Sequence, residues 1–377
     1  MLTSDQLALQ EATQDFADEQ LAPHADEWDA TSHFPVDVLR QAAEMGLGGI
    51  YINSDVGGSE LTRQDAVVVF EALATGCPTI ASYISIHNMA ASMIDRYGTE
   101  EQRQRYLPSL CTMEHLASYC LTEPGAGSDA AALRTSARRT DAGWVLNGVK
   151  QFISGAGTSQ VYVVLARTGD PGPRGISAFI VEKDTPGLSF GPDEKKMGWN
   201  AQPTRQVIFE DAQLPADALL GEEGKGFRIA MSALDGGRIN IAAASLGGAR
   251  KALEQTVRYA TERETFGTPL SGHQALRFRM ADMKTDLEVA WTFLLRAAGA
   301  LDARSPDATM LCAMAKQVAT DNGFKIANEA LQLHGGYGYL SEYGVEKIVR
   351  DLRVHQILEG TNEIMRVVIA RSILGGQ

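Results

Sequence analysis

Cysteine is scarce in this chain of 377 residues, which holds only four, widely spaced. They form no CxxC pair and have no neighbouring pair of histidines, so no metal site and no disulfide framework are predicted, and reduced, mostly buried thiols are favoured. No apolar run approaches the roughly 18 residues of a membrane span, so we expect no membrane insertion. The first residues lack the features of a signal or transit peptide. A cytoplasmic protein is expected, or one of the mitochondrial matrix if the chain is a processed form.

Basic residues are outnumbered in this chain: 34 Lys and Arg stand against 47 Asp and Glu, which gives a net charge of -13 and a pI near 5.1. Such a balance disfavours binding to nucleic acid, which requires many basic contacts to phosphates. An anionic cofactor stays compatible with it, because a few local arginines can hold a nucleotide. Hydrophobic residues make up 44% and charged residues 21%, which is typical of a soluble globular protein with two or three packed units.

Three regions differ in hydrophobic period, and together they predict an α+β protein of several domains. Residues 1–118 are expected to form an N-terminal α-helical domain, residues 119–222 a middle β-domain, and residues 223–377 a C-terminal four-helix bundle. A capping box of Thr3 and Gln6 begins the first helix. Further helices are predicted over 36–45, 63–73, 100–107, 227–262, 272–300, 307–333 and 361–374.

The middle region contains β-branched and aromatic runs of strand length. Asn147-Gly148 is typical of a hairpin turn, so the strand that begins at Trp144 is expected to end there. A loop with two prolines, 170–175, separates two of the later strands. The other strands are predicted over 161–166, 177–182 and 206–209.

Three glycine-containing segments could carry chemistry, although each also has a purely structural interpretation. Tyr119–Asp129 (YCLTEPGAGSD) combines hydroxyls with glycines that let a backbone approach a ligand, but it is neither a P-loop nor GxGxxG, so a cofactor contact and an interdomain turn are equally favoured. Alternation places Phe152 and Ser154 on one strand face, where they could cover a planar ring, while core packing of Phe152 is the commoner role. Leu234–Ile239 has two adjacent glycines in a helical pattern, at a cost of about 2 kcal/mol. They indicate either a gap for a large partner, whose negative charge Arg238 could answer, or a kink.

Two motifs of the third region break helices. RETFG at 263–267 suits the end of a long helix, with Gly267 as the residue after the C-cap. QLHGGYGY at 332–339 follows another helix, and His334 is there more often a capping or core residue than a catalyst.

The last motif, RVHQILEGTNEIMR at 353–366, holds Glu359 between Leu358 and Gly360, just before Thr361, which is a plausible helix N-cap. Burial in such an apolar setting would raise the pKa of the carboxyl, as suits a general base that works near neutrality. A lone carboxylate at this place more often only complements the helix dipole.

Taken together, YCLTEPGAGSD, FISGAG, RETFG, QLHGGYGY and ILEGTNEIMR resemble, in order and spacing, the motifs of the acyl-CoA dehydrogenase family. The resemblance covers essentially the whole chain and the combination is highly specific. It implies the acyl-CoA dehydrogenase fold, FAD as cofactor, and Glu359 as the catalytic base that removes the α-proton of an acyl-CoA thioester while the β-hydride passes to the flavin. Some members carry the base on the helix that here has Gly237, which cannot act as one.

The resemblance also implies roles for the residues that match the family. Arg263, Gln274 and the loop 332–336 would hold the FAD of a neighbouring subunit, which implies a homotetramer, a dimer of dimers. The residues expected to bind the cofactor are Tyr119, Leu121, Thr122, Gly127, Ser128, Phe152, Ile153, Ser154, Arg263, Phe266, Gln274, Gln332, Leu333, Gly335, Gly336, Thr361 and Glu363. The residues expected to bind the substrate are Ser128, Asp235, Gly236, Gly237, Arg238, Gly360 and Arg371.

Within the family, GWNAQPTR at 198–205, DGGRINIA at 235–242 and RVHQILEGTNE resemble the branch that acts on isobutyryl-CoA in valine breakdown. Leu358 replaces the aromatic that straight-chain members usually place before the base, and we hypothesise that it makes room for an α-methyl group. Phe152 stands where many members have Trp. Electrons would pass to electron-transfer flavoprotein.

Other functions are compatible with the same motifs. A dehydrogenase for butyryl- or 2-methylbutyryl-CoA and an acyl-CoA oxidase would use the same base and flavin. A flavin monooxygenase on this fold would not need Glu359, and a non-catalytic nucleic-acid-associated member is disfavoured by the charge of -13 and by the presence of Glu359.

Overall fold

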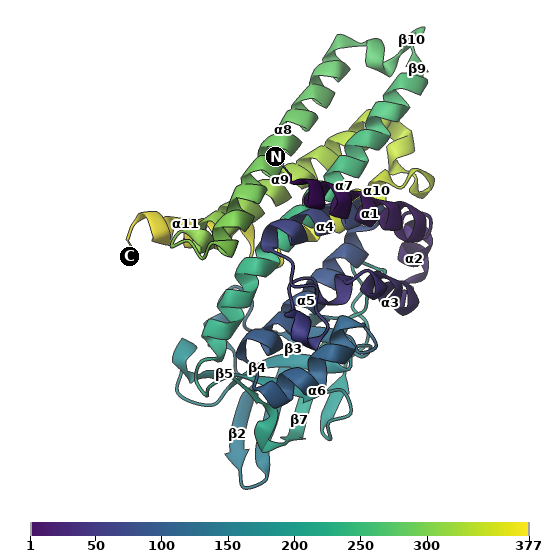
Figure 1. Ribbon diagram of the computed structural model, residues 1–377. Helices are drawn as coiled ribbons and strands as arrows, with labels where there is room; N and C mark the ends of the chain where they lie inside the picture. Colours follow the sequence, from purple (N-terminus) through teal and green to yellow (C-terminus); the bar gives the residue numbers. More distant parts are fainter. Residues whose placement is uncertain (1, 376–377) are drawn as a thin grey trace.

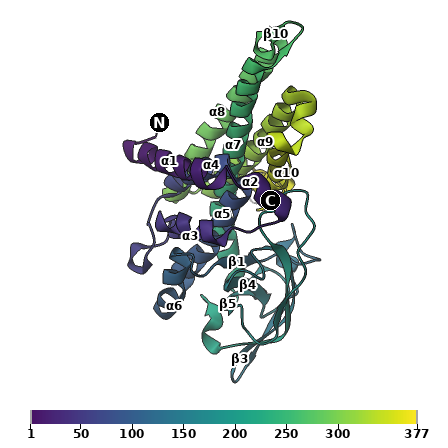
Figure 2. The same ribbon diagram turned by 90° about the vertical axis from the view of Figure 1, so that its right-hand side faces the viewer.

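The computed structural model describes residues 2–375 and confirms the expected order of helices, sheet and long helices. In Figure 1 the sheet lies at the lower end of the molecule, and the long helices of the C-terminal region extend from it to the upper end. The N-terminal helices lie beside both, as the turned view of Figure 2 also shows. The chain is therefore an α+β protein in which helical layers flank and extend one sheet.

The N-terminal region is all helical, and the predicted capping box at its start is present: Thr3 Oγ1 accepts from the N–H of Gln6, and the Gln6 side chain accepts from the N–H of Thr3. Sequence reasoning found no helix between 78 and 97, where almost every side chain of α5 is buried, including the polar ones. The helices are α1 (Ser4–Phe16), α2 (Ala25–Thr31), α3 (Val36–Glu44), α4 (Arg63–Gly76), α5 (Pro78–Tyr97) and α6 (Glu100–Cys111).

The middle region forms one eight-stranded sheet with the order β6-β7-β3-β2-β4-β5-β8, and β1 pairs in parallel with β4. Because β1 leads directly into the segment 121–129, its pairing with β4 positions that glycine-containing loop. The strands are β1 (Ala117–Cys120), β2 (Ser136–Thr140), β3 (Gly143–Ser154), β4 (Val161–Arg167), β5 (Ile176–Glu182), β6 (Leu188–Phe190), β7 (Thr204–Leu214) and β8 (Leu219–Leu220).

The hairpin turn predicted at Asn147-Gly148 was wrong, because β3 runs through both residues without a break. Gly148 instead lies at an irregularity of the β3–β7 ladder with a φ of 145°, where a Cβ would come within 2.6 Å of the backbone of Thr135. Glycine is required there for close approach of two strands. The uninterrupted β3 carries the chain on to Phe152 and Ser154.

The C-terminal region is dominated by three long helices, with a small hairpin between the first two. The first, α7, is continuous through residues 234–239, so the adjacent glycines do not end the helix. Gly267 does not follow a helix C-cap: α7 is capped at Arg263, and Phe266 and Gly267 instead form the left-handed turn of the hairpin. The elements are α7 (Gly226–Glu262), β9 (Glu264–Thr265), β10 (Thr268–Pro269), α8 (Gln274–Asp302), α9 (Ala308–His334), α10 (Val345–Arg353) and α11 (Asn362–Ile373).

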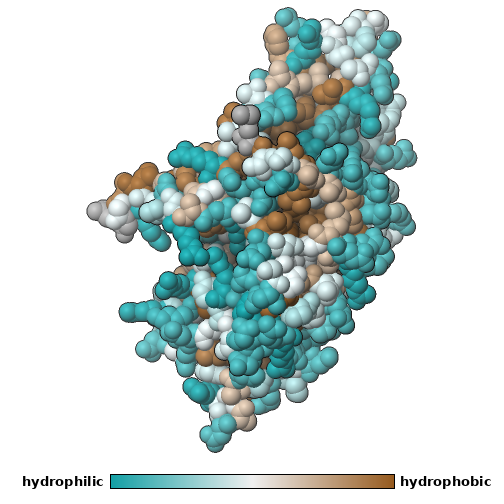
Figure 3. Space-filling view, viewed as in Figure 1, coloured by the Kyte–Doolittle hydropathy of each residue, from teal (hydrophilic) through white to brown (hydrophobic). Residues whose placement is uncertain are grey.

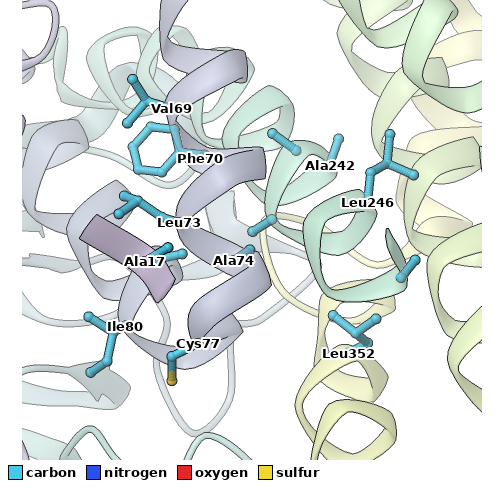
Figure 4. Close-up of a cluster of buried hydrophobic side chains, with 14 of the residues drawn as sticks. Ala17, Val69, Phe70, Leu73, Ala74, Cys77, Ile80, Ala242, Leu246 and Leu352 are labelled. Carbon is cyan, nitrogen blue, oxygen red and sulfur yellow. The ribbon is translucent and has the colours of Figure 1, made fainter. Parts of the chain in front are cut away.

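The largest core joins the N-terminal and C-terminal helices, since residues of α4, α5, α7, α8, α9 and α10 belong to one buried cluster. Figure 4 shows part of it, with Phe70 and Leu73 of α4 beside Ala242 and Leu246 of α7, and Leu352 of α10 below them. Small residues on α7 let α4 and α7 approach closely. All four cysteines are buried and unpaired, as expected. None of the helices between residues 2 and 375 is long and apolar enough to cross a membrane.

The crossing of α4 and α7 depends on Gly247. A Cβ at this position would lie 2.1 Å from the carbonyl oxygen of Glu71 and 2.9 Å from the Cβ of Ala74. We expect Gly247→Ala to lower the free energy of unfolding by about 1–3 kcal/mol, because two backbones would have to separate. Gly299→Ala on α8 is the control, since the Cβ would meet only the movable end of Gln64. Urea denaturation of both variants checks this, and equal midpoints would contradict it.

Candidate active site

Glu359 lies in the turn that joins α10 to α11. Glu359 and Gly360 both have left-handed backbones, with φ of 56° and 87°. For a residue with a side chain this conformation costs on the order of 1–3 kcal/mol, and it persists only where the surroundings enforce it. Thr361 then caps α11 as predicted, since its Oγ1 accepts a hydrogen bond of 3.3 Å from the N–H of Ile364.

The predicted gap in the surface of α7 lies directly against the Glu359 carboxyl. A Cβ on Gly237 would be 2.6 Å from Oε2 and 2.9 Å from Cδ of Glu359. The neighbouring Gly236 makes room for Arg63, whose Nη1 would be 2.6 Å from a Cβ there. Any larger residue at 237 would therefore displace the carboxyl group, which explains the adjacent glycines in a continuous helix.

The Oε2 atom of the Glu359 carboxyl is buried, although the residue as a whole is only half-buried. Its Oε2 has no hydrogen-bond partner among residues 2–375. Burial raises its pKa from an ordinary value of 4.5 to about 7, while the positive charges of Arg238 and Lys316 act in the opposite direction. The phenol of Tyr119 is likewise buried without a partner, and burial and the charge of Glu359 raise its pKa well above the usual range. The expected shift toward neutrality is thus present.

Arg238 supports the turn and does not point to open space. Its Nη1 donates to Oδ1 of Asp235 at 2.7 Å, and its Nε donates a long hydrogen bond of 3.4 Å to the carbonyl of Glu359. The other oxygen of Asp235 accepts from the hydroxyl of Thr309 at 2.6 Å. Asp235 and Arg238 are both buried, so this contact reaches the turn from the interior of the protein.

The segment 121–129 is held to the sheet by a buried ion pair that sequence reasoning missed. Lys150 Nζ donates to Glu123 Oε1 at 2.8 Å and to the carbonyl of Leu121 at 3.1 Å. Beyond this anchor the loop is open: a Cβ at Gly127 would meet nothing within 4 Å, and the N–H groups of Gly127 and Ser128 make no hydrogen bond within the described chain. Free N–H groups on an open loop suit an anionic ligand.

Phe152 does not pack in the core, which is the commoner role of such a residue. Its side chain is 64% exposed, its φ is 59°, and it lies at an irregularity of the β3–β7 ladder. Both the left-handed backbone and the exposure of a large apolar ring cost free energy, so Phe152 is a candidate for contact with a bound group. Ser154, two residues on, is half-buried and its Oγ accepts from Gln202 Nε2 at 3.3 Å. Gln202 Oε1 is buried and has no partner in the part of the chain described.

A second group of predicted residues lies elsewhere, at the end of the long helices. A cavity of about 620 Å³ is lined there by Arg263, Gln332, Leu333, Gly335 and Gly336. In Figure 1 the neighbouring β9–β10 hairpin lies at the upper end of the molecule, opposite the sheet. Phe266 at its tip is fully exposed, and so is most of Gln274 at the start of α8. One chain therefore does not bring this group to Phe152 and Ser154.

The remaining predicted residues have varied surroundings. The side chains of Leu121 and Ile153 belong to hydrophobic cores, so any ligand contact by them would use mainly the backbone. His334 is buried and stacks on Tyr259, as expected for a structural histidine. Three further predicted residues are accessible: Thr122, Glu363 and Arg371. Within residues 2–375, no hydrogen bond links their side chains to the Glu359 carboxyl.

Trp199, His355 and Lys316 were not singled out from the sequence. Trp199 and His355 are in edge contact, with ring centroids 5.4 Å apart, and Trp199 Nε1 and His355 Nε2 are both buried without a partner among the described residues. Burial lowers the pKa of His355 to about 3, so it is neutral. Lys316 lies among alanines in an apolar helical pattern, and a lysine on such a face was the signal that could have found it.

The comparisons with known proteins agree with this arrangement. Family models match residues 3–114, 118–212 and 224–374, as the N-terminal, middle and C-terminal domains of acyl-CoA dehydrogenases. The fold and the site define an enzyme with helical, β and helical domains and a buried carboxyl oxygen in the turn before a helix. The chain belongs to the acyl-CoA dehydrogenase family.

Individual members of the family show how similar the chain is to proteins of known name. The chain is 55% identical over 373 residues to mitochondrial isobutyryl-CoA dehydrogenase of Bos taurus, covering 99% of this chain and 90% of the bovine protein. It is 54% identical to the Dictyostelium discoideum protein of the same name, with the same coverage. The structure of butyryl-CoA dehydrogenase from Megasphaera elsdenii superimposes with a TM-score of 0.96 at 38% identity, over 99% of each chain.

The raised pKa of Glu359 predicts a pH-dependent stability. The carboxyl is neutral without cost below its unfolded pKa of about 4.5, so stability is lost as the pH rises through its folded pKa of about 7. We expect Glu359→Gln to become more stable relative to the unchanged protein by roughly 1–3 kcal/mol between pH 5 and pH 8. Urea denaturation over that range is the measurement. The exposed Glu223→Gln should show a constant difference, and a flat difference for Glu359→Gln would refute the assignment.

Proposed function

We propose that this enzyme dehydrogenates a short, branched acyl-CoA between Cα and Cβ with FAD as cofactor, and that isobutyryl-CoA is converted to methacrylyl-CoA. The observation that carries the proposal is the enclosed, unpartnered carboxyl oxygen of Glu359 over Gly237, with a pKa near neutrality. A carboxylate with that pKa accepts a proton from carbon better than an ordinary exposed one, and it is still ionised at neutral pH to a useful degree.

The main chain around Glu359 supports the same chemistry. An α-hydrogen beside a thioester is weakly acidic, so the charge that develops on the thioester oxygen needs hydrogen-bond donors. The N–H of Glu359 makes no hydrogen bond within residues 2–375, so it is free to donate to that oxygen. The side chain of Glu359 would then take the proton on the enclosed side, where few waters compete.

The residues present fit FAD. Exposed Phe152 and half-buried Ser154 suit a planar ring with polar edges, and the open loop at Gly127 and Ser128 suits a pyrophosphate. The unpartnered Oε1 of Gln202, beside Ser154, is a further polar atom without a protein partner. Bound in this place, FAD would supply the acceptor for the hydride of the β-carbon. The other cofactor contacts expected from the sequence are proposed unchanged.

A homotetramer, a dimer of dimers, is part of the proposal. The cavity at Arg263 and Gln332 lies far from Phe152 in one chain, so the two groups could meet at one FAD only across a subunit boundary. Exposed hydrophobic residues support an interface: Phe266 is fully exposed, and Figure 3 shows hydrophobic side chains on the projecting end of α11, where Ile373 and Leu374 are exposed. Arg371 on the same helix would reach the substrate.

We further propose electron-transfer flavoprotein as the electron acceptor, a place in valine breakdown within the wider metabolism of fatty acids, a cytoplasmic location, and domain boundaries after residues 118 and 222. The similarity to the two isobutyryl-CoA dehydrogenases supports the substrate. Half-buried Leu358 beside the base supports it independently, because a leucine leaves space that an aromatic ring would fill.

Replacing the base tests the reaction. On anaerobic titration with isobutyryl-CoA we expect the flavin absorbance to bleach in the unchanged enzyme and almost not at all in Glu359→Gln, because the amide cannot take the α-proton. The rate should fall as the pH is lowered through about 7, since only the ionised carboxyl is active. This fall is the acid limb of the pH–rate profile. Glu223→Gln is the control and should bleach normally. Bleaching of Glu359→Gln at the normal rate would exclude the role, and stoichiometric peroxide in air would indicate an oxidase.

Leu358 tests the branched substrate. We expect Leu358→Tyr to lower kcat/KM for isobutyryl-CoA relative to butyryl-CoA by about tenfold, because the ring takes the space of one methyl group. Steady-state rates with isobutyryl-, butyryl- and 2-methylbutyryl-CoA are the measurement. Leu7→Tyr, at an exposed position on α1, should keep the original ratio. A clear preference of the unchanged enzyme for butyryl-CoA would defeat the proposal.

A further inference from the structure

Lys316 is a charged residue in an interior helix face. It lies on α9 among Ala313, Ala315 and Ala319, and its side chain is 0% exposed. A buried ammonium group is expensive unless hydrogen bonds and an opposite charge compensate it. No carboxylate of the described residues lies within ion-pair distance of it, so its hydrogen-bond partners must explain why a lysine is present.

Those partners belong to the turn that carries Glu359. Lys316 Nζ donates to the carbonyl oxygen of Gly360 at 2.8 Å and to Oδ1 of Asn362 at 2.8 Å. The amide nitrogen of Asn362 in turn donates to Thr320 Oγ1 at 3.0 Å and to Asp321 Oδ1 at 2.7 Å, both on α9. The first residue of α11 is thereby tied to α9 on both sides of its amide.

Together, Lys316 and Arg238 donate to two consecutive carbonyl groups. Arg238 on α7 reaches the carbonyl of Glu359, and Lys316 on α9 reaches that of Gly360. Glu359 and Gly360 are the two residues of this turn with left-handed backbones. A costly conformation needs such external restraint, and here two helices supply it from two directions.

The charge of Lys316 acts on the same carboxyl. Burial lowers the pKa of Lys316 to about 7, against the charge of Glu359, which raises it together with Asp321 and Glu363, while Arg238 lowers it further. The groups that face Glu359 are Arg238 from α7, Lys316 from α9 and the phenol of Tyr119 from β1. Removing Lys316 would leave Arg238 as the only cation among these groups.

We infer that Lys316 is a positioning residue, which holds the Glu359–Gly360 turn through the Gly360 carbonyl and Asn362 and favours the ionised form of the Glu359 carboxyl. The inference deepens the proposed function and, for the carboxyl's catalytic use, rests on it. It assigns two separable contributions to one side chain: a hydrogen-bond donor for the turn and a charge for the base.

Hydrogen exchange of the holoenzyme tests the first contribution without any need for turnover. In Lys316→Met we expect faster exchange in peptides spanning 357–366, because the amides of Ile364 and Met365 are bonded to Thr361 and depend on the turn. Lys316→Gln, which keeps a donor, should stay closer to the unchanged protein. Lys347→Met is the matched control: it also removes a buried lysine, which donates to Asp351 at 2.7 Å, but it does not touch this turn. Exchange in 357–366 that rises equally in Lys316→Met and Lys347→Met would overturn the positioning role.

The pH dependence of kcat/KM tests the second contribution. Both Lys316→Met and Lys316→Gln should move the acid limb upward by about one pH unit or more, with roughly a tenfold loss of rate below the limb for each unit and convergence with the unchanged enzyme at high pH. Lys347→Met should leave the limb in place. An unmoved limb in both Lys316 variants would overturn the electrostatic role. If the unchanged enzyme fails to turn over acyl-CoA, the proposed function fails, whereas hydrogen exchange still decides whether Lys316 holds the turn.

Discussion

The site depends on one constraint: a carboxyl group lies against a helix at a point where the helix has no side chain. Gly237 leaves 2.6 Å between a hypothetical Cβ and Glu359 Oε2, so the carboxyl can be enclosed between α7 and the turn before α11. Enclosure removes water and raises the pKa, which turns a weak base into one suited to neutral pH. The adjacent glycines weaken α7 locally, and packing against α4 and α9 offsets that loss.

The same constraint explains why so many charges are buried around a single turn. A left-handed glutamate does not hold itself in place, and its neighbours are hydrogen-bond donors from two different helices, Arg238 and Lys316. Asp235 accepts one further hydrogen bond from Arg238, and Asn362 accepts one from Lys316. Charges that are costly to bury are therefore used where rigid placement of one backbone segment matters more than stability.

The proposed flavin-binding side of the site is built differently, from a sheet loop and an exposed aromatic residue. On the sheet, the ion pair of Lys150 and Glu123 fixes the base of a loop whose glycines and free N–H groups face outward, and Phe152 is held in an exposed, left-handed conformation. The second group of residues proposed to bind the cofactor lines a cavity at the opposite end of the long helices. Under the proposed function these are two incomplete halves of one cofactor site, and their separation is the physical argument for assembly with further copies.

Much of this protein could be determined from the sequence alone, because local patterns carry local physics. Hydrophobic period separated helices from strands, the capping residues Thr3 and Thr361 marked helix starts, and the apolar neighbours of Glu359 predicted its raised pKa. The sequence did not decide features that arise from distant parts of the chain. The glycine at 148 serves a close approach to Thr135 and not a turn, and the polar residues of α5 are buried instead of forming an exposed face. Lys316 acquires its hydrogen-bond partners only when α9 meets the turn at Gly360. Tertiary structure decided these points because a residue's neighbours across the fold, and not along the chain, set its hydrogen bonds, its burial and its charge.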